Sequence, residues 1–293
     1  MKLFEIKQIV LISFNINKKL MKYLKIFYPK TIKIIMLFGI LMMFTACENI
    51  FEFSAYMANV QEEDKNTTAK NLQLIEDIQS ESKDFKFAFV TDTHFFFDNL
   101  KTVLQDINKR EDVSFVIFGG DYTEQGLLKE YEIFYDILKN LEKPFVTVIG
   151  NHDYSSNGGI IYEEMFGAFN YSFQFNDNKF VLFDNIVWES NKNPDFDWLS
   201  SELSTSELFN KVFVIAHIPT TDNQFSDVME QTYAAIMFEN NVSLSLHGHR
   251  HSYSYEELYG DGIKYLTVPS LKNPEYSIIH VKDGSFDIEI IQL

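Results

Sequence analysis

Five short apolar stretches of the chain each run into a loop that carries histidine, aspartate or asparagine, and this repetition limits most strongly what the chain can fold into. The stretches are rich in Val, Ile and Phe, which predicts β-strands. Because neighbouring strands bring their ends together at one edge of a sheet, we expect these side chains to converge there. The loops are Asp92-Thr93-His94, Gly119-Gly120-Asp121, Gly150-Asn151-His152-Asp153, His217 and His247-Gly248-His249-Arg250-His251.

The converging groups are three carboxylates, five or six imidazoles and one carboxamide. Mixed oxygen and nitrogen donors suit Mn, Fe, Zn or Co better than Ca or Mg. More donors converge than one four- to six-coordinate ion uses, which favours two ions, with Asp121 bridging them at about 3.5–4 Å. Two divalent cations outweigh Asp92, Asp121 and one hydroxide, so the site would be locally positive and would attract phosphate.

The ordered series Asp-x-His, Gly-Asp, Gly-Asn-His-Asp, an isolated His and Gly-His-x-His resembles the calcineurin-like metallophosphoesterase superfamily, from residue 85 to about residue 270. The stretches GGDYTEQGLLKEYEIFYDILKNLEKPFVTVIGNHD and FNYSFQFNDNKFVLFDN are similar to its branch of cyclic-nucleotide and glycerophosphodiester phosphodiesterases. The resemblance implies that a hydroxide bridging two metal ions hydrolyses a phosphoester.

The family pattern, carried over position by position, also implies the role of each site residue. His152 would stabilise the phosphoryl oxygens or protonate the leaving alkoxide, and Asp153 would orient His152 or His217 by accepting a ring N–H. The first ion would be held by Asp92, His94, Asp121 and His251, and the second by Asp121, Asn151, His217 and His249.

Several residues beside these loops could have either a structural or a functional role. We expect His247 to be a strand-end histidine rather than a ligand, His280 to be non-catalytic and Arg250 to point away from the ions. The run Phe95-Phe96-Phe97 packs in the core or lines a cleft that stacks an aromatic leaving group. Candidate substrate contacts beside the loops are Tyr122, Tyr154, Tyr253 and Tyr255.

Strands and helices alternate in the first half of the region from Phe85 onward, and strands dominate its second half. This order predicts an α/β fold in which a second sheet packs on the first, and the resemblance implies a four-layer α/β/β/α sandwich of two mixed sheets. Helices are predicted at Leu100–Lys109, Leu127–Leu141 and Tyr162–Phe166. Strands are predicted at Phe85–Thr91, Val113–Phe118, Phe145–Ile149, Phe180–Phe183, Val212–Ala216, Val242–Leu246, Ile263–Val268, Tyr276–Val281 and Phe286–Ile291.

Residues 1–47 contain eight Lys and one Glu, so this segment carries a net charge of +7. Because the whole chain carries −17, the remaining residues carry −24. The apolar run Ile34–Phe44 is too short to span a bilayer but suits a secretory signal. The small residue before Cys47 resembles a lipobox, so we expect an exported lipoprotein anchored through Cys47, with Met21 as a possible start. The alternative is an uncleaved amphipathic or core helix with an incidental cysteine.

Residues 48–84 are acidic and read as a tether with a packed helix over Thr67–Gln79, followed by a metallophosphoesterase domain over 85–293.

The acidic balance and only two Arg argue against a protein that neutralises many nucleic-acid phosphates. Motifs for a serine nucleophile, a P-loop or a dinucleotide site are absent from the sequence. We therefore expect a small phosphodiester or phosphomonoester as substrate. The alternatives are a protein phosphatase or nuclease of the same superfamily, and a metal-binding surface lipoprotein without turnover.

Overall fold

The computed structural model describes residues 18, 21–22, 33–34, 54 and 56–293. The predicted signal segment, including Cys47, lies almost entirely outside the described residues. The chain divides after Ser54 into two units, and the unit that begins at Ala55 is described here by itself. No helix in the described part of the chain combines the length and apolar character needed to cross a membrane.

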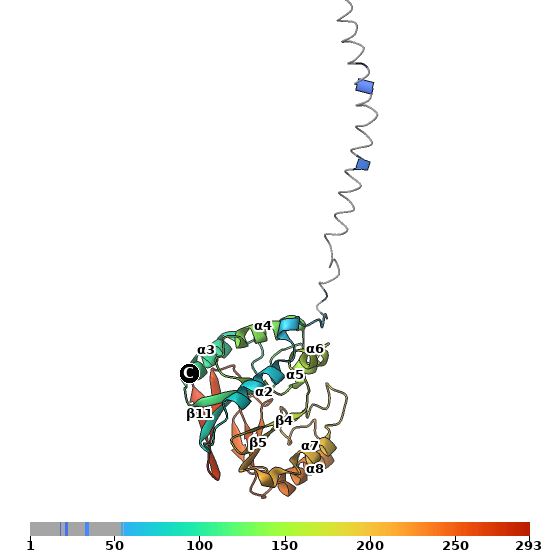
Figure 1. The fold of residues 1–293 in the computed structure, drawn as a ribbon. Coiled ribbons are helices and arrows are strands. Elements are labelled where there is room, and N and C mark those ends of the chain that lie inside the picture. Colours follow the sequence, from blue (N-terminus) through green and yellow to red (C-terminus); the bar gives the residue numbers. More distant parts are fainter. Residues whose placement is uncertain (1–17, 19–20, 23–32, 35–53, 55) are drawn as a thin grey trace, which may run out of the picture. The chain divides into compact units, whose positions relative to one another are not determined.

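Two mixed β-sheets form the centre of this unit (Figure 1). The first has the strand order β11-β10-β1-β2-β3, with β1, β2 and β3 parallel and β10 antiparallel to β1. Its strands are β1 (Phe85–Val90), β2 (Val113–Phe118), β3 (Phe145–Thr147), β10 (Glu275–Lys282) and β11 (Ser285–Gln292).

The second sheet has the order β4-β5-β6-β7-β9-β8. Its central strands β5, β6, β7 and β9 are parallel, and an antiparallel strand closes each edge. Its strands are β4 (Tyr171–Phe175), β5 (Asn178–Leu182), β6 (Lys211–Ile215), β7 (Leu244–His247), β8 (Ser254–Glu256) and β9 (Lys264–Thr267).

Aromatic side chains fill the space between the two sheets. Phe87 on β1 lies against Phe115 on β2, with ring centroids 5.5 Å apart, and meets Phe213 on β6 edge to face at 5.4 Å. These residues are fully buried, and each of the first sheet's central strands alternates between this layer and the opposite face. Burial of so much apolar surface is the main force that holds the sheets together.

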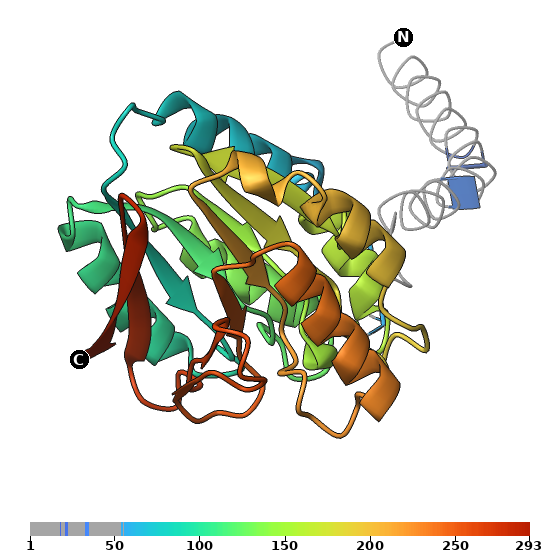
Figure 2. The ribbon, with the colours of Figure 1, turned by 90° about the horizontal axis from the view of Figure 1, so that it is seen from below.

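Helices cover the outer face of each sheet, which completes the four-layer α/β/β/α sandwich (Figure 2). Leu100, Leu104 and Phe134 pack helices against the first sheet, and Leu199 and Tyr233 pack helices against the second. The helices on the first sheet are α3 (Phe97–Lys109), α4 (Leu128–Leu138) and α6 (Gly158–Met165), and those on the second are α7 (Phe196–Leu203) and α8 (Asp227–Glu239). The short helices are η1 (Glu62–Asp64), α5 (Asn151–Tyr154) and η2 (Ser206–Leu208).

Helix α2 (Thr67–Asp77) packs beside the edge strand β3. Its Ile75 is buried in the layer between the sheets, and its Asn71 accepts a hydrogen bond from the backbone N–H of Phe145 at 2.9 Å. This bond occupies a donor that an edge strand would leave open. The helix predicted over Thr67–Gln79 is therefore present and packed.

The structure differs from the sequence-based expectation in how strands are shared between the sheets. Strand β5 belongs to the second sheet, whereas β10 and β11 return to the first, so the order along the chain does not separate the sheets. Strands β4 and β8 were not predicted, because β4 is largely half-exposed and β8 has only three residues. Helices α7 and α8 lie in segments for which no element was predicted.

Candidate metal centre

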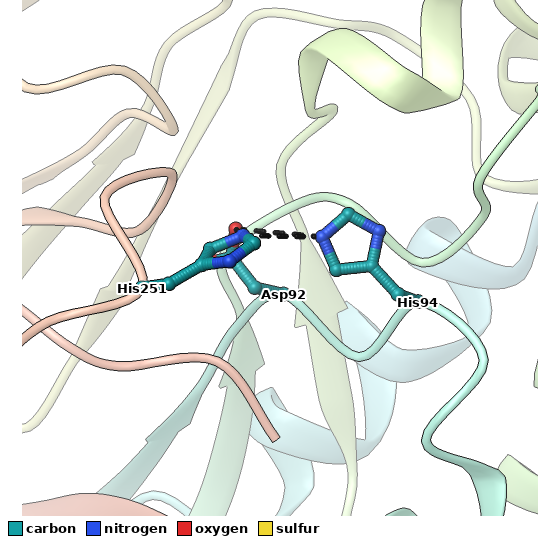
Figure 3. Close-up of side chains that lie close together, drawn as sticks. All are labelled: Asp92, His94 and His251. Carbon is teal, nitrogen blue, oxygen red and sulfur yellow. Dashed lines mark hydrogen bonds and ion pairs between the residues drawn. The ribbon is translucent and has the colours of Figure 1, made fainter. Parts of the chain in front are cut away.

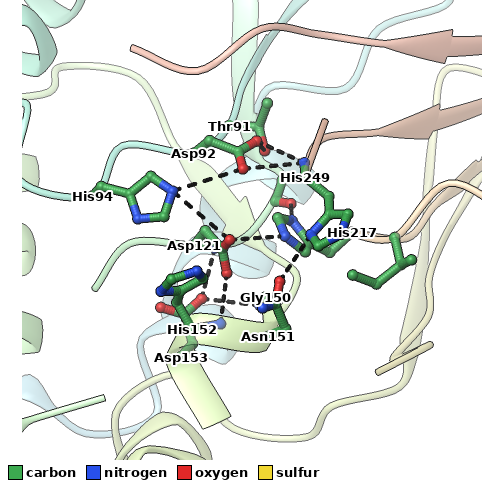
Figure 4. Close-up of polar contacts among 12 residues, drawn as sticks. Thr91, Asp92, His94, Asp121, Gly150, Asn151, His152, Asp153, His217 and His249 are labelled. Atoms are coloured by element: carbon green, nitrogen blue, oxygen red, sulfur yellow. Dashed lines mark hydrogen bonds and ion pairs between the residues drawn. The ribbon is translucent and has the colours of Figure 1, made fainter. Parts of the chain in front are cut away.

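All five predicted loops meet at one edge of the sandwich (Figure 4). Strands β1, β2 and β3 of the first sheet and β6 and β7 of the second end there, so the polar residues that follow each strand face a common space. The seven predicted ligands come together in two groups that the carboxylate of Asp121 connects: Asp92, His94 and His251 in the first, and Asp121, Asn151, His217 and His249 in the second.

The first group joins the loop after β1 to the loop after β7 (Figure 3). The Nε2 atoms of His94 and His251 lie 3.2 Å apart, and Nε2 of His251 lies 3.1 Å from Oδ1 of Asp92. Nε2 of His94 is also 3.8 Å from Oδ2 of Asp121, which connects this group with the second. Two imidazole nitrogens and two carboxylates that face one point are a donor set for a transition-metal ion.

The second group surrounds the carboxylate of Asp121. Nε2 of His217 lies 3.1 Å from Oδ2 of Asp121, and Nδ1 of His249 lies 3.0 Å from Oδ1 of Asn151. The other nitrogen of His217, Nδ1, lies 2.7 Å from the carbonyl oxygen of Gly119. That contact fixes the ring so that Nε2 faces the centre, as a hydrogen bond to the other ring nitrogen does for metal-ligating histidines.

The donor chemistry of the two groups fits divalent cations. Nε2 of His217 is buried and makes no hydrogen bond among the described residues, although it lies beside Asp121. Burial alone would lower the pKa of His217, but the charge of Asp121 outweighs it and raises that pKa to about 10. Burial likewise opposes ionisation of Asp121, but His217 holds the pKa of that carboxyl below its ordinary value. The site therefore stabilises positive charge between these two side chains.

Five of the seven predicted ligands have a left-handed backbone conformation. Their φ angles lie between 40° and 67°, a range that residues other than glycine seldom adopt. Strain of this kind persists where the surrounding structure enforces it, and it clusters at functional sites. The five residues are Asp92, His94, Asp121, His249 and His251.

His152 is half-buried beside the first group. Its ring meets that of His94 edge to face, with centroids 4.9 Å apart, and its backbone N–H donates to Oδ1 of Asp121 at 2.9 Å. Its Nδ1 lies 3.0 Å from the carbonyl oxygen of Glu124, which leaves Nε2 for a substrate oxygen. Burial would lower the pKa of His152, but the charge of Asp121 and the Glu124 carbonyl raise it.

The carboxylate of Asp153 accepts hydrogen bonds from backbone N–H groups rather than from the imidazole N–H groups that the sequence led us to expect. Its carboxylate accepts the backbone N–H groups of Asp121, Tyr122, Thr123 and Gly150 at 2.8–3.0 Å and the Thr123 hydroxyl. The ring nitrogens of His152 and His217 that were expected to donate to it face carbonyl oxygens instead. Asp153 therefore shapes the two ligand loops through their backbone rather than orienting a histidine ring.

Most of the neighbouring candidates lie away from the centre. His247 is buried and contacts the hydroxyl of Ser245 at 2.8 Å, and burial lowers its pKa to about 3. His280 on β10 pairs with Asp84 at 2.6 Å. Tyr122 is fully buried and donates to the carbonyl of Phe118. Exposed aromatic side chains beside the ligand loops are Phe95, Tyr253 and Tyr255, whereas Phe96 and Phe97 pack against the core.

Three acidic residues near the centre were not predicted from the sequence. Oε2 of Glu124 lies 3.1 Å from Nδ1 of His94, and Oδ2 of Asp222 lies 3.5 Å from Nε2 of His249. Oε1 of Glu189 accepts a hydrogen bond from Nδ2 of Asn151 at 3.2 Å. Glu124 follows the Gly-Asp loop closely enough to be a candidate, but Glu189 and Asp222 sit in long loops without a recognisable motif.

The chain resembles solved structures of metal-dependent phosphatases. A dimetal phosphatase from Danio rerio superposes with a TM-score of 0.58 at 11% sequence identity, over 71% of this chain and 96% of that one. The purple acid phosphatase PPD1 from yellow lupin, Lupinus luteus, gives a TM-score of 0.60 at 14% identity, over 72% of this chain and 52% of that one. At such identities the likeness concerns the fold.

A local sequence match adds one curated relative, the "Probable glycerophosphodiester phosphodiesterase GpdQ" of Arcobacter nitrofigilis. It is 38% identical over 55 residues, which is 19% of this chain and 20% of the relative. The chain thus matches only about one fifth of that relative's length. The sequence model described as Calcineurin-like phosphoesterase matches residues 85–253, which contain all five ligand loops and more than half of the chain. The chain belongs to the calcineurin-like phosphoesterase family.

Proposed function

We propose that the chain hydrolyses a small phosphodiester or phosphomonoester with two metal ions bound at the sheet edge. The observation that supports this proposal is that the seven predicted ligands gather in two groups on either side of the Asp121 carboxylate. Asp92, His94, Asp121 and His251 would hold one ion, and Asp121, Asn151, His217 and His249 the other. When bound, such ions act as Lewis acids toward phosphoryl oxygens and lower the pKa of water.

His152 is the proposed catalytic side chain. Its Nδ1 is held by the carbonyl of Glu124, so Nε2 can hydrogen-bond a phosphoryl oxygen or protonate the departing alkoxide. Asp121 accepts the backbone N–H of His152, which ties the position of the catalytic ring to a shared metal ligand. A small displacement of either loop would therefore disturb both.

The acidic composition supports a small substrate. A net charge of −17 and only two arginines argue against a protein that neutralises many nucleic-acid phosphates. The named activity of the Arcobacter relative, a glycerophosphodiester phosphodiesterase, favours a diester. A protein phosphatase, a nuclease or a metal-binding protein without turnover are the alternatives.

Two chromogenic esters test the proposal. The purified protein with added Mn²⁺ should hydrolyse p-nitrophenyl phosphate or bis(p-nitrophenyl) phosphate, and the preferred ester separates monoesterase from diesterase. His152→Ala should lower kcat by about 10²- to 10⁴-fold and leave the metal content at the wild-type level. His280→Ala, the matched control on β10, should change neither quantity. Two bound ions without turnover of either ester would favour the metal-binding protein.

We further propose that the protein is exported and anchored through a lipid on Cys47. The support is the basic segment, the apolar run Ile34–Phe44 and the small residue before the cysteine.

A further inference from the structure

Two of the unpredicted carboxylates contact the predicted ligands from outside the centre. Glu124 lies in the loop between β2 and α4, and Glu189 lies in the loop between β5 and α7. Neither belongs to the five loops that carry the predicted ligands, although Glu124 lies in the stretch after Asp121 that resembles the phosphodiesterase branch. Each carboxylate contacts the atom of a predicted ligand that points away from the centre. Glu124 does so in the first group and Glu189 in the second.

Glu124 meets the outward nitrogen of His94. Nε2 of His94 faces the centre, where it lies 3.2 Å from Nε2 of His251, so Nδ1 is the outward atom. Oε2 of Glu124 is 3.1 Å from that Nδ1, and the His94 side chain is only 7% exposed. Nδ1 of His94 is buried and makes no hydrogen bond among the described residues, so Glu124 faces it as an ion-pair partner and favours the tautomer that carries the proton on Nδ1.

Glu189 meets the outward nitrogen of Asn151. Nδ2 of Asn151 donates to Oε1 of Glu189 at 3.2 Å, and Oδ1 of Asn151 lies 3.0 Å from Nδ1 of His249. A carboxylate can only accept, so it selects the amide orientation in which the oxygen faces the centre. Glu189 is half-buried as a whole, but its second oxygen is shielded from solvent and has no hydrogen-bond partner among the described residues.

We propose that Glu124 and Glu189 are positioning residues, one for each metal ion, that hold His94 and Asn151 with their donor atoms toward the centre. The inference rests on the proposed two-ion site. Outer carboxylates of this kind raise the basicity of a ligating imidazole and fix its tautomer, and their loss typically costs about 10- to 100-fold in metal affinity. Neither residue is expected to contact substrate.

Metal binding without substrate tests the proposal. Equilibrium dialysis of the full-length protein with Mn²⁺, followed by metal analysis, should give two ions for the wild type. Glu124→Gln and Glu189→Gln should each raise the Kd of one ion about 10- to 100-fold and still bind two ions at saturation. The double variant should bind both ions more weakly, and its changes in binding free energy should be the sum of those of the single variants, because the two residues act on different groups. Glu132→Gln, which removes a surface pair with Lys129, is the control.

Stability separates positioning from a structural role. Glu189→Gln should leave the metal-free melting temperature close to the wild-type value, because the residue is half-buried and glutamine keeps the size of the side chain, while it weakens Mn²⁺ binding. Unchanged Kd values in both variants would overturn the proposal. Loss of one ion at saturating Mn²⁺ would also overturn it, because the carboxylate would then be a ligand. These measurements of metal binding and stability involve no turnover. Their outcome therefore tests the positioning roles of Glu124 and Glu189 separately from the proposed hydrolytic function.

Discussion

Gly248 packs against the carboxylate of Asp92 so closely that an added methyl group should displace this ligand. A Cβ at Gly248 would lie 2.4 Å from Oδ2 of Asp92 and 2.1 Å from Oγ1 of Thr91. Neither atom can retreat freely, since Oδ2 accepts hydrogen bonds from the Thr91 hydroxyl and from the backbone N–H of His249. Ordinary contact distances near 3.4 Å require Asp92 to move by about 1 Å.

We therefore expect Gly248→Ala to lower kcat by about 100-fold, the usual consequence of a 1 Å misplacement in an active site. The overpacked loop should cost only about 1–3 kcal/mol of unfolding free energy, so the protein should stay folded. The assay combines kcat for bis(p-nitrophenyl) phosphate with metal content and thermal unfolding followed by circular dichroism.

Gly284→Ala provides the matched control. Gly284 lies in the turn between β10 and β11 with φ of 75° and no atom within 4 Å of the added Cβ. Its replacement should cost about 1–2 kcal/mol through backbone strain and leave kcat unchanged. Wild-type kcat and two bound ions in Gly248→Ala would refute the reasoning, because the contact with Gly248 would then not fix Asp92.

Three further results are expected. Asp153→Asn should lower the free energy of unfolding by about 2–5 kcal/mol in urea titrations, because its amide nitrogen leaves buried N–H donors without an acceptor; wild-type stability would show that the loops do not depend on this carboxylate. Burial raises the pKa of Asp106, but hydrogen bonds from Arg110 and Tyr276 outweigh it and lower the pKa below its usual 3.8. Asp106→Asn should therefore cost stability most above pH 5 and progressively less as the pH falls below 4; a pH-independent difference would contradict this linkage. Cys47→Ser should abolish labelling by a radioactive fatty acid in the producing cell, and persistent labelling would exclude the proposed anchor.

The chemistry of the centre was easier to predict than the topology around it. Asp92, Asp121 and His217 each follow a strand in which all residues but one are buried, so the apolar runs located both the strands and the residues at their ends. The membership of the strands in the two sheets depends on long-range pairing, such as that of Phe85 with Val281, which leaves no local pattern. The sequence therefore predicted which residues gather at this sheet edge, but not that β10 and β11 return to the first sheet.

The outer residues were harder to predict for a different physical reason. Glu189 acts through a hydrogen bond across 38 positions of the chain, and an isolated acidic residue in a loop is common in a chain with 42 Asp and Glu. The role of Asp153 was expected to involve an imidazole, but the close approach of the two loop backbones gives its carboxylate several N–H donors instead. Such assignments require the relative positions of the loops.

The left-handed conformation of five ligands also limits how this sheet edge can change in evolution. Aspartate and histidine tolerate that conformation better than most residues, so the side chains proposed to bind metal also suit the turns that present them. A change to alanine loses the donor and adds backbone strain, whereas glycine or asparagine relieves the strain and keeps the turn. We therefore expect relatives of this chain that lack hydrolytic activity to carry glycine or asparagine at the positions of Asp92, Asp121 and His249. These substitutions should raise their free energy of unfolding.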